Sequence, residues 1–197
     1  MPKPYEIRAT FDRENITVYQ AFNKKIAEEA IKHQTFQSPF STNRMTWIKP
    51  SFLWMMERSN WGQKSNQEHI LAIQLKRTIF ENILSQGILT SPSKRVYKSG
   101  IEWQTQFKDA KIYLQWDPER SFRGNKLEYR SIQIGISRHL IEEYVKEWIV
   151  SIQDMTPVVK KMHQLSKKGD HTKAKKHLPI EKAYSLKDEI KKVIGAS

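Results

Sequence analysis

The sequence predicts an α+β fold in which a mixed, mainly antiparallel sheet, either continuous or split, is flanked by helices. Apolar and polar residues alternate at 111–116 and 130–137, which is typical of half-buried strands. Apolar residues recur at helical spacing within 24–33. The patterns follow one another in the order β-β-α-α-β-α-β-β-α-β-α. Because this order combines hairpins with crossovers, it favours α+β over a purely parallel α/β fold.

The first half of the chain opens with a predicted hairpin, since two β-patterned runs at 7–11 and 16–22 flank turn residues 12–15. Asn23 is a suitable N-cap for a helix over 24–33, and a polar loop follows at 37–43. A second helix over 51–58 begins behind Pro50 and ends before Gly62. Its first two turns are apolar on nearly every face, so we expect this helix to be buried.

The second half is predicted from the same kinds of pattern. Strand 111–116 should end in a turn at Asp117-Pro118, because Asp and Pro suit the first two positions of a β-turn. The other expected elements are a strand at 69–75, a helix at 77–86 closed by Gly87, a basic loop at 91–100, a strand at 130–137, a helix at 138–146, a strand at 148–153, a helix from 157 and a last helix at 186–194.

A chain of 197 residues suits one domain with an appendage. We predict an α+β core over residues 1–166 and a basic C-terminal extension over 167–197 that packs on the core. The region from 157 onward is rich in Lys and lacks Arg, and it carries about half of the excess positive charge. The arginines therefore lie in the body, where their forked guanidinium groups suit phosphate or carboxylate.

Charge is the strongest bulk signal, with 34 Lys and Arg against 21 acids and a net charge of +13. Such a field attracts polyanions, so a nucleotide or a nucleic acid is the expected partner. The absence of Cys excludes disulfides, thiolate zinc sites and a cysteine nucleophile. The six His show no metal-ligand spacing, so no metal is expected. The lack of a long apolar run or signal peptide predicts a cytoplasmic protein, or a nuclear one in a eukaryote, with no membrane contact.

The densest candidate site is segment 44–62, in which three Trp at a spacing of seven alternate with cations. Aromatic faces stack on bases and cations hold phosphates, which makes Arg44, Trp47 and Lys49 candidate ligand-binding residues. The helix start behind Pro50 offers free N–H groups to an anion near Lys49 and Ser51. The alternative is that the Trp and Met side chains are core, with Lys49 and Arg58 on its rim.

Further candidates lie on predicted strands. Arg8 needs either a structural carboxylate or an anionic ligand, and it lies near Tyr19 and Gln20 in the predicted hairpin. Gln133 lies mid-strand on the polar face beside Gly135, where a ligand could approach closely. Nucleic-acid contacts are expected from Arg58, Arg120, Arg123 and Arg130. A turn does not hold Asp117 and Glu119 in a fixed geometry, so a two-carboxylate hydrolase is not expected. The phosphate-loop, dinucleotide-fold, HExxH and GxSxG motifs are absent.

Several blocks together resemble domain-of-unknown-function family 4291 (DUF4291), over about residues 5–184. They are YEIRA at 5–9, VYQA at 18–21, MTWIKPSFLWM at 45–55, QWDPER at 115–120, RSIQIG at 130–135 and EWIV at 147–150. Residues 18–36 are also similar to the opening strand, helix and turn of ADP-ribosyltransferases and RNA 2′-phosphotransferases. That resemblance implies a split sheet and NAD as cofactor. This chain has Gln20 in place of the expected His, and Gln133 would have to replace the catalytic Glu.

We therefore expect a nucleotide-using, NAD-dependent transferase of the ADP-ribosyltransferase type that modifies or binds nucleic acid. Gln133 and Tyr19 are the catalytic candidates: Gln133 would orient the acceptor, and either Tyr19 or Trp47 would stack on a ring. Arg8 and Arg44 would hold the pyrophosphate, with Gln20, Trp47, Lys49 and Ser51 completing the cofactor site. Two alternatives stay open: a non-enzymatic basic nucleic-acid-binding module, and an interaction protein whose lysine-rich tail docks an acidic partner.

Overall fold

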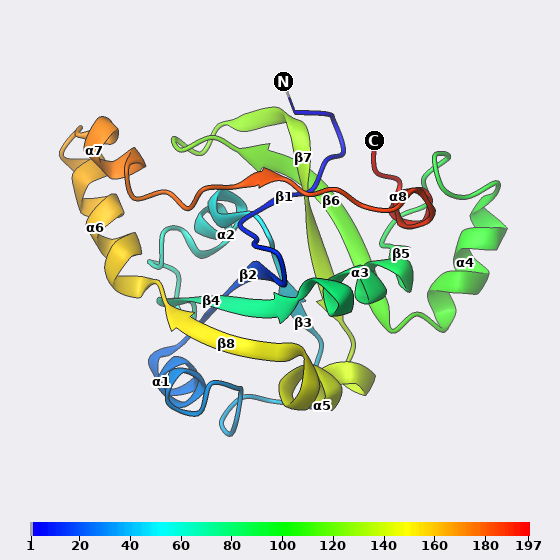
Figure 1. Ribbon diagram of the computed structural model, residues 1–197, viewed down its shortest axis with the longest axis horizontal. Helices are drawn as coiled ribbons and strands as arrows, with labels where there is room; N and C mark the ends of the chain where they lie inside the picture. Colours follow the sequence, from blue (N-terminus) through cyan, green and yellow to red (C-terminus); the bar gives the residue numbers. More distant parts are fainter. Residues whose placement is uncertain (1) are drawn as a thin grey trace.

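Two sheets form the body of the protein, a computed structural model of which describes residues 2–197 (Figure 1). Met1, the first residue of the predicted core domain, lies outside the described residues. The first sheet has the order β2 (Asn15–Phe22), β4 (His69–Lys76), β8 (Ile149–Asp154) and is antiparallel. The second has the order β3 (Thr46–Ile48), β7 (Lys126–Ile136), β6 (Ile112–Arg120), β5 (Gly87–Leu89), in which only β5 and β6 are parallel. A short pair joins β1 (Arg8–Ala9) to β9 (Lys182–Ala183). The predicted α+β class with a mainly antiparallel sheet is confirmed.

The two larger sheets meet at a single antiparallel bridge between Tyr19 of β2 and Lys49, just after β3. The Tyr19 N–H donates to the Lys49 carbonyl at 2.7 Å, and the Lys49 N–H donates to the Tyr19 carbonyl at 3.2 Å. We call this junction between the two sheets the seam. Successive side chains of a strand point to opposite faces, so Tyr19 and Gln20 lie on opposite faces of β2 at the seam. The candidate site lies at this seam.

Eight α-helices, with two irregular turns, surround the sheets in the described chain. Asn23 caps α1 as predicted, accepting from the Ile26 N–H at 3.1 Å. The buried helix behind Pro50 is also confirmed, with Phe52, Met55 and Met56 in the core. The helices are α1 (Lys24–His33), α2 (Phe52–Ser59), α3 (Arg77–Ser85), α4 (Gly100–Lys108), α5 (Ile141–Glu143), α6 (Thr156–Lys167), α7 (His171–Lys175) and α8 (Asp188–Ile194). A 3₁₀ turn (Arg138–Leu140) and a π turn (Tyr144–Trp148) flank α5, so the predicted helix 138–146 is a composite.

The alternation of β6 and β7 sorts their side chains as the sequence predicts. Ile112 and Leu114 of β6, with Ile132 and Ile134 of β7, are buried in the main hydrophobic core. The opposite face carries Gln115 and Gln133, which are paired across the two strands. That polar face is therefore available for a site.

The predicted turn at Asp117-Pro118 is wrong, because β6 continues to Arg120 and the chain reverses only at residues 121–125. Proline lacks the N–H that a central strand needs, yet it is tolerated where one strand edge is free or irregular. Strand β5 pairs β6 only as far as Leu114, so Pro118 lies beyond that pairing, next to a register irregularity between Pro118 and Arg120. This correction brings Asp117 onto the same face as Gln115.

Other elements were not predicted from the sequence. Helix α4 has a weak apolar pattern and no buried residue, but Ser99 caps it by accepting from the Glu102 N–H at 3.1 Å. Gly87 starts β5 rather than merely closing α3.

The C-terminal segment crosses the body, as Figure 1 shows from α7 to α8 beside β1. Its β9 pairs with β1, and α8 packs on α3 and β5. No helix within residues 2–197 is long and apolar enough to cross a membrane.

Candidate functional site

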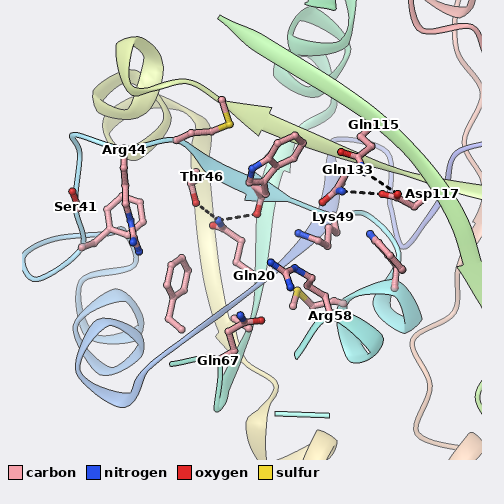
Figure 2. A pocket seen from close by; sticks show the side chains of 17 residues that line it. Gln20, Ser41, Arg44, Thr46, Lys49, Arg58, Gln67, Gln115, Asp117 and Gln133 are labelled. Carbon is pink, nitrogen blue, oxygen red and sulfur yellow. Dashed lines mark hydrogen bonds between the residues drawn. The ribbon is translucent and has the colours of Figure 1, made fainter. Parts of the chain in front are cut away.

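A pocket of about 720 Å³ opens at the seam between the two sheets (Figure 2). Side chains from β2, β3, α2, β6 and β7 line it, together with the loop before β3. Its polar lining consists of Gln20, Ser41, Arg44, Thr46, Lys49, Arg58, Gln67, Gln115, Asp117 and Gln133. Its size falls within the roughly 300–1,000 Å³ that is usual for small-molecule sites.

A clamped carboxylate lies at one end of this pocket. The Gln115 side-chain amide donates to Asp117 Oδ1 at 2.9 Å, and the Gln133 amide donates to Asp117 Oδ2 at 2.8 Å. The geometry follows from the sheet, since Gln115 and Gln133 are cross-strand partners and Asp117 is two residues further along β6. Two neutral amides thus fix the orientation of Asp117 without neutralising its charge.

Lys49 is a nearly buried cation in the same pocket, with a relative exposure of 4%. It forms no ion pair with any residue that the structure describes. Burial, helped by the nearby positive charge of Arg58 and opposed by the charge of Asp117, lowers the pKa of Lys49 to about 8. An anionic ligand beside Lys49 would supply the counter-charge that the chain itself does not provide.

Arg44 and Arg58 add two exposed guanidinium groups to the lining. Figure 2 shows Arg44 and Asp117 toward opposite ends of the pocket, with Arg58 and Lys49 near each other between them. With Lys49 charged, the pocket therefore has three cations against one carboxylate, so it favours an anion.

Trp47 and Trp54 supply aromatic surface to the lining. The Trp47 ring lies over Gly135, its cross-strand partner, since a Cβ at Gly135 would come within 2.9 Å of Trp47 Cη2. The close approach predicted at Gly135 is thus made by the indole of Trp47. The glycine gives Trp47 the room to lie flat along the pocket wall.

Six of the residues predicted to bind a ligand or act on it line the pocket: Gln20, Arg44, Trp47, Lys49, Arg58 and Gln133. The amide of Gln20 is occupied internally, because it donates to Thr46 Oγ1 at 2.7 Å and to the Trp47 carbonyl at 3.1 Å. It also accepts from the Tyr144 hydroxyl at 2.7 Å. Gln20 therefore braces the pocket wall, and the same contacts hold β3 in place.

Tyr19, Ser51 and Arg8 lie elsewhere, around Glu181 of the C-terminal segment. Tyr19 is 1% exposed and packs edge-on against Phe52, with burial raising its pKa. Ser51 caps α2 by accepting from the Trp54 N–H at 3.1 Å. Arg8 donates to Glu6 at 3.1 Å and to the Glu181 carbonyl at 3.0 Å. The structure thus divides the predicted single site into two groups, and only one of them lines the pocket.

The position at the start of α2, where an anion was predicted, is occupied by the side chain of Glu181. Its Oε1 accepts from the Phe52 N–H at 2.7 Å. Burial raises the pKa of Glu181 to about 8, with Glu119 adding to the rise and the Phe52 N–H and Arg8 opposing it. The helix start is therefore occupied by an internal carboxyl group, which a pKa of about 8 keeps largely protonated at neutral pH.

The arginines expected to bind nucleic acid differ in whether their guanidinium groups already contact other residues of the chain. Arg120 contacts Glu57 at 3.5 Å and the Gly124 carbonyl at 3.2 Å, and its guanidinium lies 5.5 Å from the Trp54 ring centre. Arg130 donates to the Trp116 carbonyl at 3.1 Å. Arg123 is exposed and lines a smaller hollow next to His163, separate from the pocket.

Sequence reasoning missed Asp117 and Gln115 as site residues. The signal was present, because Tyr113, Gln115 and Asp117 continue a single period-two face. The Asp-Pro pair was assigned to a turn, so the continuation of strand β6 through Asp117 was not predicted. No group of three or more His, Asp or Glu able to hold a metal occurs within residues 2–197.

The fold and the pocket define an α+β protein with a cationic, aromatic-lined pocket at the seam of a split sheet. The chain matches the family model described as Domain of unknown function (DUF4291) over residues 6–184, and it belongs to that family. No protein of curated function matches it.

Proposed function

We propose that this protein is a nucleotide-using transferase of the ADP-ribosyltransferase type, with NAD as cofactor and nucleic acid as the partner. The observation that supports it is the convergence of three cations, a clamped carboxylate and indole surface on one pocket. These are the groups that a phosphorylated ribonucleotide requires.

Lys49 and Arg58 are the residues that hold the pyrophosphate in this proposal. Arg binds phosphate through a fork of donors, and Lys binds it as a point charge. Because phosphate adds negative charge beside a partly desolvated ammonium, its binding raises the pKa of Lys49 and keeps the side chain protonated. Trp47 offers the face on which a base or nicotinamide ring stacks.

Asp117 takes the role that Gln133 was predicted to fill in place of a glutamate. Bound NAD would supply an ADP-ribosyl group for transfer, with nicotinamide as the leaving group. Asp117, held by Gln115 and Gln133, would stabilise the positive charge that develops on the ribose and would accept the proton that the acceptor gives up. Gln133 then acts as a positioning residue, because it holds Asp117.

Nicotinamide release from NAD, with and without short single-stranded RNA or DNA, tests the proposal. Asp117→Asn should keep NAD affinity but slow release by about 10²–10³-fold, the cost of removing one preorganised electrostatic group. Lys49→Met should weaken NAD binding by about 1.5–3 kcal/mol, the range for hydrogen bonds to charged groups. Glu128→Gln, an exposed acid change on β7, is the matched control and should alter neither. Equal NAD binding by the wild type and Lys49→Met would contradict the proposal.

A non-enzymatic nucleic-acid-binding module is the second candidate function. It is favoured by the pairing of Arg8 with Glu6 and of Gln133 with Asp117, which occupies one predicted cofactor-binding residue and one predicted catalytic residue. Oligonucleotide binding without nicotinamide release from NAD would select this candidate.

A further inference from the structure

A second hollow, of about 800 Å³, adjoins the pocket and shares Arg44 and Met45 with it. We call it the basic hollow. It lies between the end of α4, the start of β6 and the 3₁₀ turn after β7, and none of the predicted site residues except Arg44 lines it. Arg44 therefore lies at the boundary between the two depressions.

The basic hollow has a strong excess of positive charge. Lys108, Lys111 and Arg138 are exposed and line it together with Arg44, against the single acid Asp109. None of these four cations forms an ion pair with a residue in the described chain, whereas Lys24, Lys146, Lys173 and Lys191 elsewhere do. Unpaired cations gathered on one concave surface favour a polyanion over an isolated anion.

The base of the hollow is held by regular backbone contacts. The Ser137 N–H donates to the Lys111 carbonyl at 2.9 Å, where β7 ends beside the start of β6. The Tyr113 ring lines the hollow and packs edge-on against Phe107 of α4 at 5.2 Å. A ring and four cations at a fixed site provide both stacking and phosphate contacts.

We propose that the basic hollow binds the backbone of a single-stranded nucleic acid and presents its acceptor base to the pocket past Arg44. The proposal rests on the proposed function, in which Lys49, Arg58 and Asp117 hold NAD at the other end of the pocket. A single strand fits because a base can enter the pocket only if it is unpaired and unstacked. Phosphates then lie on Lys108, Lys111 and Arg138, while Tyr113 offers a stacking face.

Fluorescence polarisation with a short labelled single-stranded RNA, and with DNA of the same sequence, tests this. The variant Lys108→Gln/Lys111→Gln/Arg138→Gln removes three charges from the hollow. Its affinity should fall by about tenfold or more, and the slope of log K against log salt should lose about two units, since each phosphate contact on a single strand contributes about 0.7.

The matched control is Lys160→Gln/Lys161→Gln/Lys168→Gln, which removes the same charge from exposed positions in and just after α6. Figure 1 shows α6 on the opposite side of the molecule from α4. This control should lose less than about threefold, as expected for general attraction alone. Equal losses in both variants would overturn the proposal, as would an acidic polypeptide that competes as well as the unlabelled strand.

Calorimetry with NAD separates this inference from the proposed function. The hollow variant should bind NAD as the wild type does, because none of its three changes lines the pocket. One outcome would separate the two: the wild type does not bind NAD, and the triple variant of the hollow loses affinity for the single strand while the α6 control does not. In that case the transferase proposal fails and the strand-binding surface stands. If NAD binds and neither variant affects the strand, the strand-binding surface fails alone.

Discussion

Replacing Lys49 with Met should stabilise the fold while weakening ligand binding. Lys49 is an ammonium held in a nearly buried position without an ion-pair partner in the described chain. Methionine has a similar length and carries no charge, so it keeps the packing and removes the free-energy cost of desolvating the ammonium group.

The magnitude follows from the pKa of Lys49, which falls from 10.5 to about 8 on folding. A shift of this size corresponds to about 3 kcal/mol of destabilisation at pH values where the side chain is charged in both states. Below pH 8 that cost is present in full. Between pH 8 and 10.5 the folded protein releases the proton while the unfolded chain keeps it, so wild-type stability rises through this window. The advantage of Lys49→Met should therefore be largest below pH 8 and shrink by about 3 kcal/mol toward pH 10.5.

Urea unfolding followed by tryptophan fluorescence, at several pH values from neutral to alkaline, measures this difference. Tyrosines and other lysines titrate equally in both proteins, so their contributions cancel in the comparison. Lys126→Met, at an exposed position at the start of β7, is the control and should stay within about 0.5 kcal/mol of the wild type at every pH.

Two outcomes would refute the reasoning about Lys49. A destabilised Lys49→Met would mean that the ammonium makes a favourable contact in the folded state. A constant difference between Lys49→Met and the wild type across pH 8–10.5 would mean that the pKa of Lys49 is not lowered.

Two further predictions concern the groups around the site. Because the pKa of Glu181 rises from 4.5 to about 8 on folding, the folded state retains a proton that the unfolded chain loses, and stability should fall as pH rises through that window. Glu181→Gln keeps an acceptor for the Phe52 N–H, so it should remove this pH dependence of stability. In chemical denaturation at pH 8 it should be more stable than the wild type by about 2 kcal/mol or more. An unchanged pH dependence would contradict the raised pKa of Glu181. Gly135→Ala should displace the Trp47 ring from the pocket wall, because the new Cβ would lie 2.9 Å from Trp47 Cη2. The displacement should quench or shift tryptophan fluorescence and weaken nucleotide binding. Wild-type affinity in this variant would mean that Trp47 does not contact the ligand.

The local patterns of the sequence predict much of the fold, since burial repeats at a fixed spacing within one element. The alternation of β6 and β7 and the apolar start of α2 identify which faces are buried. Helix α4 escapes this reasoning, because it buries no residue and so leaves no clear periodic signal. The pairing of β1 with β9 escapes it too, since two residues carry no pattern and the partners are far apart in the chain.

The candidate site was predictable only in part, because it depends on which face of the seam each side chain occupies. Arg44, Trp47, Lys49 and Gln133 were singled out by residue type and do converge. Arg8 was expected beside them, but it pairs with Glu6 two residues away and donates to the carbonyl of Glu181, 173 residues further along the chain. The sequence showed that Arg8 needs an acceptor without showing which acceptor reaches it.

The two buried ionisable residues at the seam, Glu181 and Lys49, differ in whether the chain itself provides a partner for the side chain. Around Glu181, the chain itself supplies the Phe52 N–H at the start of α2 and the nearby charge of Arg8, and the raised pKa leaves the carboxyl group largely protonated at neutral pH. Around Lys49, it supplies two more cations and a carboxylate that is held by amides, so the positive charge is left in excess. Because a desolvated cation without a partner costs free energy, a bound anion beside Lys49 would offset part of that cost. The lowered pKa of Lys49 and the occupied start of α2 therefore both favour the pocket over the start of α2 as the position where an anion would bind.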